Sequence, residues 1–255
     1  MSTVTLTTDL GLHDHYVAWL RGCLLTADPT LRLVDISHHL PRFDLVRGSF
    51  VFRNAWRHFP EGTIHLVSVY DQPAPSAGML IFEHKGHFFI GPDNGFFSLA
   101  FPGADLRMFG NTYPPGADLY LHYAQTIARL VREGSPAALA PALSDWQRRS
   151  LLAPIEKPNE IRGTVIHTDR FGNAFTNIHR AAFERVGRGR PFELYFRRHE
   201  PLRSLSSAYH EVPVGMPLCR FGTADVLEIS VNSGNASELL GLVPDGVVLV
   251  LFAEA

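Results

Sequence analysis

The sequence has little cysteine, no excess of one charge and no long hydrophobic run, and each absence excludes a class of protein. Its two cysteines, Cys23 and Cys219, lie far apart and outside any C-x-x-C spacing, which excludes a disulfide framework and a cysteine-based zinc site. The 23 lysines and arginines nearly balance the 25 aspartates and glutamates, so no net charge favours nucleic acid or a membrane surface as a partner. No apolar run approaches the roughly 20 residues that a membrane-spanning helix needs.

Metal-binding patterns and targeting signals are also scarce. Most of the 13 histidines are scattered, and His38, His39, His84 and His87 have neither a companion cysteine nor an HExxH pattern. We therefore expect them in surface or capping roles, and we expect no metal. The chain opens on a β-rich run instead of a basic stretch followed by an apolar segment, which predicts no signal peptide and a cytoplasmic protein.

The first half of the chain contains strand and helix patterns in alternation. The β-rich runs are 4–9, 31–37, 62–70 and 79–95, the last of them a hairpin-like pair of strands. The segments with helical spacing are 15–27, 44–59 and 118–133. Asp14, Asp44 and Asp118 are suitable N-caps for these helices. The alternation predicts an α/β N-terminal domain with a mostly parallel sheet over residues 1–155.

The pattern changes around Pro154 and Pro158, which flank a polar stretch typical of a linker. Beyond it, short β-rich runs follow one another at close spacing, and only 236–242 has a helical pattern. This predicts a smaller all-β, barrel-like C-terminal domain over residues 160–255.

Polar side chains stand at the ends of two predicted strands. Asp9 ends the first run, and Tyr70 and Asp71 interrupt the stretch HLVSVYDQPAPSAGM at 65–79. Open α/β sheets bind ligands beyond the carboxyl ends of their strands. The Asp9 carboxylate can accept two hydrogen bonds from a vicinal diol or an amine, and the alternative is that it caps a turn.

Two polar turns in the second half could also bind a ligand. In VIHTDRFGNAFTNI (165–178), an amide at Asn173 beside the ring of Phe171 can read the edge and face of a purine, and a plain hairpin turn is the alternative. In VNSGNASELLG (231–241), backbone amides could bind a heterocycle or a carboxylate, and a strand–turn–helix connection capped by Asn235 is the alternative.

These segments are more informative together than singly. In chain order they are TTDLGLHDHYVAWLRG, VDISHHLPRFDLVRGSFVF, FPEGTIHLVSVY, GPDNGFFSL, DRFGNAFTNI and VLEISVNSGNASELLG. The ordered set resembles the S-adenosylmethionine hydroxide adenosyltransferase family, which includes fluorinases and chlorinases, and it spans essentially the whole chain. The resemblance implies that the protein binds S-adenosylmethionine and that a small nucleophile attacks its C5′ carbon and releases methionine.

The resemblance also implies which residues bind the adenosyl group. Asp9 matches the aspartate that grips the ribose hydroxyls, and Phe43 falls at an aromatic position beside the ribose. Phe171 and Asn173 match the pair that contacts adenine. Tyr209 is a looser match to a further aromatic wall.

The remaining matches concern methionine and the adenine turn. Asp169 matches the carboxylate that meets the methionine amino group, and Thr223 stands where the family has a serine near the methionine carboxylate. Asn232 and Ser233 fall in the turn whose backbone reads adenine. Ala224 replaces an arginine of the halogenating members, which argues against their carboxylate clamp.

The family's water-activating set of aspartate, arginine and histidine is the part that this chain does not match. Counting without gaps from Gly62 places the aspartate on Tyr70, with Asp71 one position later. Halogenating members have a tyrosine there, and such a ring can exclude water near C5′. Thr112 is the nearest hydroxyl to those that surround halide in the family. Tyr70, Asp71 and Thr112 are therefore the candidate catalytic residues.

The partners of the missing aspartate are replaced as well. The arginine position falls on Ala77 or Gly78, and the histidine position falls on Pro114 or Pro115. Three interpretations stay open. In the first, the protein cleaves the C5′–sulfonium bond with water or a small anion and gives L-methionine together with adenosine or a 5′-substituted adenosine. In the second, it is a catalytically silent binding or sensing protein. In the third, it is an enzyme that acts on a related adenosyl substrate.

The resemblance further implies a homotrimer, with the ligand between the N-terminal domain of one subunit and the C-terminal domain of its neighbour. S-adenosylmethionine is then the substrate, and no further cofactor, nucleic acid or membrane is expected.

Overall fold

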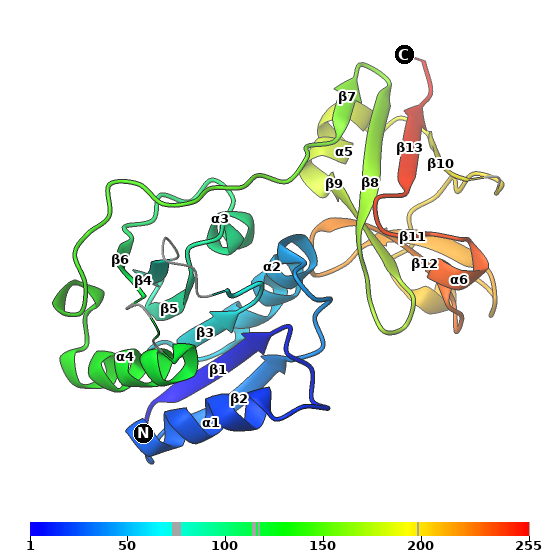
Figure 1. Cartoon of the computed structure of the whole chain (residues 1–255). Helices are drawn as coiled ribbons and strands as arrows, with labels where there is room; N and C mark the ends of the chain where they lie inside the picture. The colour runs from blue at the N-terminus through cyan, green and yellow to red at the C-terminus, as the bar shows by residue number, and fades with distance from the viewer. Residues whose placement is uncertain (73–77, 114–115, 117, 198, 255) are drawn as a thin grey trace. The chain divides into compact units, whose positions relative to one another are not determined.

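The computed structural model describes residues 1–72, 78–113, 116, 118–197 and 199–254. The chain divides into two compact units, Met1–Leu151 and Leu152–Ala255, each with a sheet and a hydrophobic core of its own (Figure 1).

The N-terminal unit is built around a six-stranded sheet in the order β2-β1-β3-β5-β4-β6. Its strands are β1 (Thr3–Thr8), β2 (Arg32–Ser37), β3 (Ile64–Ser68), β4 (Gly78–His84), β5 (His87–Pro92) and β6 (Phe109–Thr112). Its α-helices are α1 (Tyr16–Ala27), α2 (Leu45–Ala55), α3 (Phe96–Ala100) and α4 (Leu119–Glu133). Helices α1 and α4 cover one face of the sheet, and α2 and α3 cover the other (Figure 1).

This sheet is mixed, so the expectation of a mostly parallel sheet is not confirmed. β1 pairs in parallel with β2 and β3, and β3 with β5, whereas β4 is antiparallel to both β5 and β6. The cause is the two-residue turn between β4 and β5, in which Lys85 and Gly86 have φ values of 50° and 74°. A tight turn with two positive φ angles joins antiparallel strands.

Alternate strand residues face the two helix layers, as the period of two in a strand requires. Leu6 and Leu66 lie in the core under α1 and α4, while Val67 and Phe89 pack against α2 and α3. Because β1 and β3 are parallel neighbours, the segments that follow them leave the core at the same edge of the sheet. The candidate residues of this unit lie at that edge.

Helix caps show how local chemistry sets the helix boundaries. Asp44 accepts a hydrogen bond from the backbone N–H of Arg47, and Asp118 caps α4 in the same way. The cap expected at Asp14 is wrong, because α1 begins at Tyr16 and the preceding His15 makes no capping bond with its side chain.

Two of the histidines expected at the surface are buried instead. His38 and His87 are 2% and 5% exposed. His38 Nδ1 lies 2.8 Å from Thr8 Oγ1, and His87 Nδ1 lies 3.1 Å from His65 Nε2. One ring nitrogen of each histidine is therefore held by a side chain inside the fold, which a scattered sequence pattern does not reveal.

The C-terminal unit is a curled antiparallel sheet in the order β10-β13-β8-β9-β12-β11, with β7 paired to β8 (Figure 1). Its strands are β7 (Ile155–Lys157), β8 (Glu160–Thr168), β9 (Ala174–His179), β10 (Phe192–Phe196), β11 (Pro217–Phe221), β12 (Val226–Val231) and β13 (Val247–Phe252). Two short helices, α5 (Arg180–Gly187) and α6 (Ala236–Leu239), complete it. Helix α6 is the one expected from sequence, and Asn235 caps it through the N–H of Glu238.

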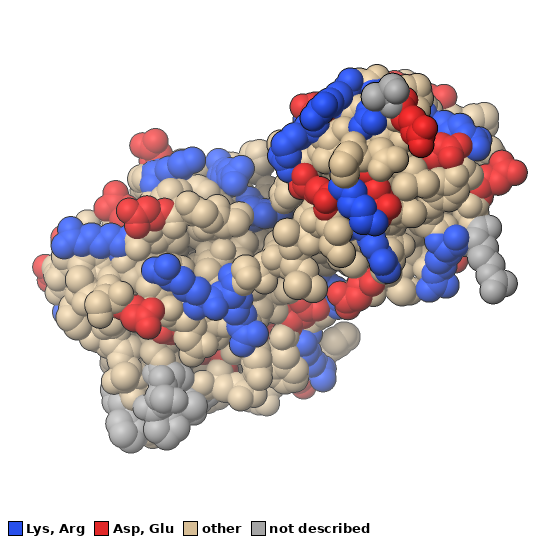
Figure 2. Space-filling view, turned by 90° about the horizontal axis from the view of Figure 1, so that it is seen from above, with Lys and Arg blue, Asp and Glu red and all other residues tan. Residues whose placement is uncertain are grey.

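Basic and acidic side chains are interspersed over the face that Figure 2 shows. Within the described residues, no helix is both long and apolar enough to cross a membrane. No three histidine, cysteine, aspartate or glutamate side chains in the same part of the chain are grouped so that they could hold a metal ion.

Candidate functional site

Asp9 joins three loops at the carboxyl edge of the N-terminal sheet. Its Oδ2 accepts hydrogen bonds from the backbone N–H of Phe43 at 2.8 Å and of Tyr70 at 3.1 Å. Phe43 and Tyr70 have φ values of 63° and 49°, a left-handed conformation that costs a non-glycine residue roughly 1–3 kcal/mol. Asp9 thus helps to hold two strained loops, and its Oδ1 accepts no hydrogen bond from the described residues.

The rings of Phe43 and Tyr70 form an aromatic pair beside Asp9. Their centroids are 5.3 Å apart in an edge-to-face arrangement, and the side chains are 59% and 39% exposed. Asn94 fixes the segment that follows β3, because its Nδ2 donates to the carbonyls of Val69 and Tyr70. The turn at Asp93-Asn94-Gly95 therefore positions Tyr70, a role that turn chemistry alone does not indicate.

Asp71 follows Tyr70 and turns inward. Its Oδ2 accepts a hydrogen bond of 2.6 Å from the hydroxyl of Tyr123, which lies 2.9 Å from the hydroxyl of Tyr113. Burial raises the pKa of Asp71 to about 6, and the charge of Asp9 adds to this, while hydrogen bonds from Tyr123 and Ser68 act in the opposite direction. The two tyrosines were not among the sequence candidates.

The remaining candidate catalytic position and the positions of the missing arginine and histidine are less informative. Thr112 is exposed at the end of β6, where it pairs with Gly78 of β4. Ala77, Pro114 and Pro115 lie outside the described residues.

The C-terminal unit contains a cavity of 640 Å³. Five of the predicted binding residues line it: Asp169, Phe171, Asn173, Tyr209 and Ser233. Val231, Gly234 and Asn235 complete the lining. Segments more than 60 positions apart in the sequence thus meet in one cavity that combines two aromatic rings, two amides and a carboxylate.

The loop before β9 owes its shape to Asp169. Its Oδ1 accepts from the backbone N–H groups of Phe171 and Asn173, both at 2.9 Å, and its Oδ2 accepts from Asn173 Nδ2 at 3.0 Å. Gly172 has a φ of 85°, and a Cβ there would lie 1.9 Å from Asn235 Oδ1. The glycine is required both by the turn and by the close approach of the second loop.

Tyr209 is fixed by a buried polar network that sequence analysis missed. Its hydroxyl donates to Glu228 Oε1 at 2.8 Å, and the Ser230 hydroxyl donates to the same oxygen. Arg220 stacks over the Tyr209 ring at 4.7 Å, and its Nε lies 4.0 Å from Glu228 Oε2. Burial, followed by the effect of Glu228, raises the pKa of Tyr209 to about 12. A glutamate inside the apolar strand VLEISV is the signal that could have revealed this network.

Two predicted residues do not line the cavity. Asn232 donates from Nδ2 to the carbonyl of Val212 at 2.7 Å and so holds the loop before β11. Thr223 is exposed in the turn between β11 and β12. The structure therefore gives Asn232 a structural role and leaves Thr223 apart from the other candidates of this unit.

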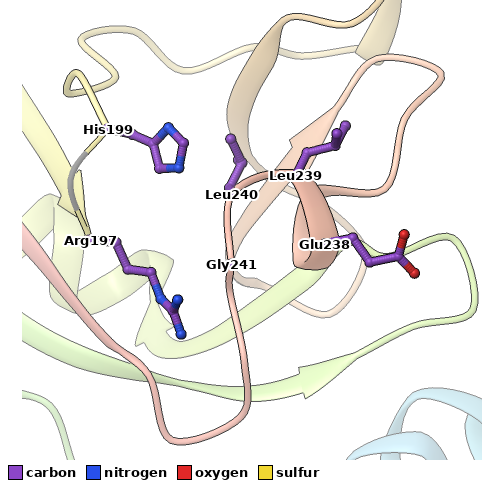
Figure 3. Close-up of a pocket in the computed structure, with 6 residues that line it drawn as sticks. All are labelled: Arg197, His199, Glu238, Leu239, Leu240 and Gly241. Atoms are coloured by element: carbon purple, nitrogen blue, oxygen red, sulfur yellow. The ribbon is translucent and has the colours of Figure 1, made fainter.

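Two further hollows contain few of the candidates. One of 560 Å³, which Figure 3 shows, is lined by Arg197, His199, Glu238, Leu239, Leu240 and Gly241. The other, of 670 Å³, adjoins Phe43 and Tyr70 and is bordered by Arg42, Arg148 and Arg149. The Glu238 carboxylate in Figure 3 points away from Arg197 and His199, so these side chains do not converge on one ligand position.

Comparison with models of protein families shows to which family the chain belongs. The model described as the SAM hydroxide adenosyltransferase N-terminal domain matches residues 4–132, and that of the C-terminal domain matches residues 163–248. The chain belongs to the SAM hydroxide adenosyltransferase family. The resemblance in the order of the sequence motifs is thereby confirmed.

Similarity to individual proteins agrees with this assignment to the SAM hydroxide adenosyltransferase family. The chain is 32% identical over 265 residues to (R)-S-adenosyl-L-methionine hydrolase of Thermus thermophilus, covering 95% of this chain and 96% of the relative. It is 24% identical over 224 residues to a fluorinase of an Actinoplanes species, covering 73% and 74%. An uncharacterized conserved protein from Thermotoga maritima has the same fold, with a TM-score of 0.82, 24% identity and coverage of 98% and 99%.

Proposed function

We propose that this protein binds S-adenosylmethionine and cleaves the bond between C5′ and the sulfonium sulfur. Water, hydroxide or a small anion is the nucleophile, and the products are adenosine or a 5′-substituted adenosine and L-methionine. The observation that carries the proposal is the C-terminal cavity, in which five residues chosen from sequence come together. Relatives named for hydrolysis and for fluorination support this reaction class.

The cavity has the chemistry that such a substrate requires. The ring of Phe171 and the amide of Asn173 suit the face and edge of a purine. The carboxylate of Asp169 and the π-face of Tyr209 suit a ligand that carries ammonium and sulfonium charges. We assign Ser233 to the wall of the adenine position, and we keep Thr223 and Asn232 as weaker candidates because they lie outside the lining.

The edge of the N-terminal sheet supplies the complementary groups. Asp9 has Oδ1 for the ribose hydroxyls, and the paired rings of Phe43 and Tyr70 offer a wall that excludes water. The sulfonium is already a charged leaving group, so alignment of the nucleophile with C5′ accounts for most of the catalytic task. Tyr70, Asp71 and Thr112 are the proposed residues on the nucleophile side, and no cofactor beyond the substrate is needed.

We also propose that the active form is a homotrimer in the cytoplasm that binds its ligand between neighbouring subunits, as the family resemblance implies. Size-exclusion chromatography with light scattering tests the trimer directly. A monomer at all concentrations that is nevertheless active would contradict it.

The reaction is tested with purified protein and S-adenosylmethionine, with and without chloride, followed by chromatography of the nucleoside products. Both sulfonium epimers are used, because hydrolase relatives are named for the (R) epimer. Adenosine, or 5′-chloroadenosine with chloride, is the expected product. Tight binding by calorimetry without product over hours would instead support the silent binding protein, and absence of binding would refute the ligand assignment.

A further inference from the structure

The register of the N-terminal sheet brings Thr8 and His38 together. β1 and β2 are parallel neighbours in which Thr7 pairs with Ser37, so Thr8 and His38 follow side by side at the same edge (Figure 1). His38 Nδ1 lies 2.8 Å from Thr8 Oγ1 there. This contact therefore stands immediately before Asp9, the carboxylate that follows β1.

His38 holds the backbone on both sides of Asp9. Its ring contacts Thr8, the residue before Asp9, and its backbone carbonyl accepts a hydrogen bond of 2.7 Å from the N–H of Gly11, two residues after Asp9. Thr8 and His38 are 0% and 2% exposed, whereas Asp9 is only partly buried. The interior of the protein thus fixes the backbone of a carboxylate that remains accessible to a ligand.

The groups around His38 set the direction of this contact. Asp35 Oδ1 lies 3.0 Å from His38 Nε2 and favours the tautomer with its proton on Nε2, so we assign Nδ1 as the acceptor for the Thr8 hydroxyl. The N–H of Leu10 donates to Thr8 Oγ1 at 3.3 Å, which leaves the hydroxyl proton free for His38. Arg21 of α1 pairs with Asp35 and holds it in place. Burial lowers the pKa of His38, although Asp35 acts in the opposite direction, so the ring stays neutral near pH 7.

The position of Asp9 matters because only one of its oxygens is available. Oδ2 accepts from the backbone N–H groups of Phe43 and Tyr70, and Oδ1 has no partner among the described residues. A vicinal diol presents two neighbouring O–H donors, and hydrogen bonds weaken steeply when their distance or angle changes. The carboxylate therefore distinguishes a diol from a single hydroxyl only if its backbone is held in one place.

We propose that His38 and Thr8 are positioning residues that give the site its preference for a ribose over a 2′-deoxyribose, because they fix the backbone of Asp9. This rests on the proposed function, in which Asp9 binds the ribose hydroxyls. The substrate class is then a ribonucleoside, and its selection depends on a buried bond that does not touch the ligand.

The test is a ratio, the dissociation constant of 2′-deoxyadenosine divided by that of adenosine, measured by calorimetry on the intact protein. Wild type should give a ratio of roughly 10 or more, because the deoxynucleoside lacks a donor to a charged group. Thr8→Val and His38→Gln should each lower the ratio by about threefold or more, and the double variant should lower it no further, because both changes break one bond. Thr8→Ser keeps the hydroxyl and should retain the wild-type ratio.

Thr5→Val is the matched control. Thr5 is fully buried in the same strand, and its hydroxyl oxygen lies 2.7 Å from Nδ1 of His65. The variant therefore breaks an equivalent threonine–histidine contact that is not adjacent to Asp9. It should lower the free energy of unfolding and leave the ratio unchanged, since a loss of folded protein affects both nucleosides equally.

Each outcome bears on a separate claim. A wild type that binds neither adenosine nor S-adenosylmethionine refutes the proposed function, and one that binds both nucleosides equally refutes the role of Asp9; the positioning role fails with either. An unchanged ratio in folded Thr8→Val and His38→Gln, or an equal loss in Thr5→Val, refutes the positioning role alone. If neither buried variant folds, Asp35→Ala decides, because the Asp35 side chain is 37% exposed. It removes the carboxylate that fixes the ring and should lower the ratio, and an unchanged ratio would refute the proposal.

Discussion

A buried histidine pair should make the stability of the N-terminal unit depend on pH. His65 is fully buried in β3, with Nδ1 at 2.7 Å from Thr5 Oγ1 and Nε2 at 3.1 Å from His87 Nδ1. Its ring stacks on Phe89 at 5.0 Å. Burial, with a smaller effect of His87, lowers the pKa of His65 from 6.5 to about 3. The folded protein therefore holds this imidazole neutral.

The direction and the size of this pH dependence follow from the linkage between folding and the protonation of His65. Below pH 6.5 the unfolded chain binds a proton at His65 that the folded chain rejects, so the stability present above pH 6.5 is lost as the pH falls toward 3. One unit of pKa corresponds to about 1.4 kcal/mol, so the free energy of unfolding should drop by about 2 kcal/mol between pH 7 and pH 5. Asp71 acts in the opposite sense, since its pKa is raised to about 6, and a variant must separate the two.

The assay is urea unfolding followed by circular dichroism at several pH values between 5 and 7.5. His65→Gln keeps polar atoms beside Thr5 but removes the titration, so its stability should be lower at pH 7 and less dependent on pH than that of the wild type. His39→Gln, at an exposed position, is the matched histidine control and should follow the wild-type slope. Equal slopes in His65→Gln and wild type would refute the reasoning.

Three further predictions concern the candidate binding residues. Asp9→Ala and Asn173→Ala should each weaken S-adenosylmethionine binding by about 1–3 kcal/mol in calorimetry, and unchanged affinity in both would remove the proposed site. Gly172→Ala should lower the free energy of unfolding by about 1–3 kcal/mol, because the φ of Gly172 is 85° and the new Cβ would meet Asn235. A free energy of unfolding in urea equal to that of the wild type would contradict this. Tyr209→Phe removes the hydroxyl bond to Glu228 and should raise KM more than it lowers kcat; an unchanged KM would show that the bond does not position the ring.

Local chemistry made much of the fold predictable. Asp44 and Asp118 are N-caps because a side-chain oxygen satisfies free N–H groups of the first turn, and that depends on a few adjacent residues. Strand direction was predicted only in part. The hairpin-like pair over 79–95 is confirmed, but its turn at Lys85-Gly86 makes β4 antiparallel to β5, so the sheet is mixed and not mostly parallel. Helix α5 was missed because its eight residues give too short an apolar stripe, formed by Ala182, Phe183 and Val186.

The candidate site was predictable where it depends on loop chemistry and not where it depends on long-range contacts. Phe171 and Asn173 were found from one turn, and both line the cavity. Tyr123 lies 52 positions from Asp71, so no local pattern joins them. Its burial could have been read from α4, since it stands three positions after the buried Tyr120 on the same helix face.

For the predicted carboxylates, the structural and the ligand-binding interpretations turn out not to exclude each other. Asp169 uses Oδ1 for two backbone N–H groups, and within the described residues its Oδ2 accepts only from Asn173. Asp9 likewise directs Oδ2 to the N–H groups of Phe43 and Tyr70 and has Oδ1 without a partner among the described residues. A carboxylate has about four acceptor positions, so one oxygen can hold the loop while the other meets a ligand. Loss of binding in an alanine variant at either position therefore combines a lost contact with a displaced loop, and the asparagine variant, which keeps the acceptor for the loop, separates the two.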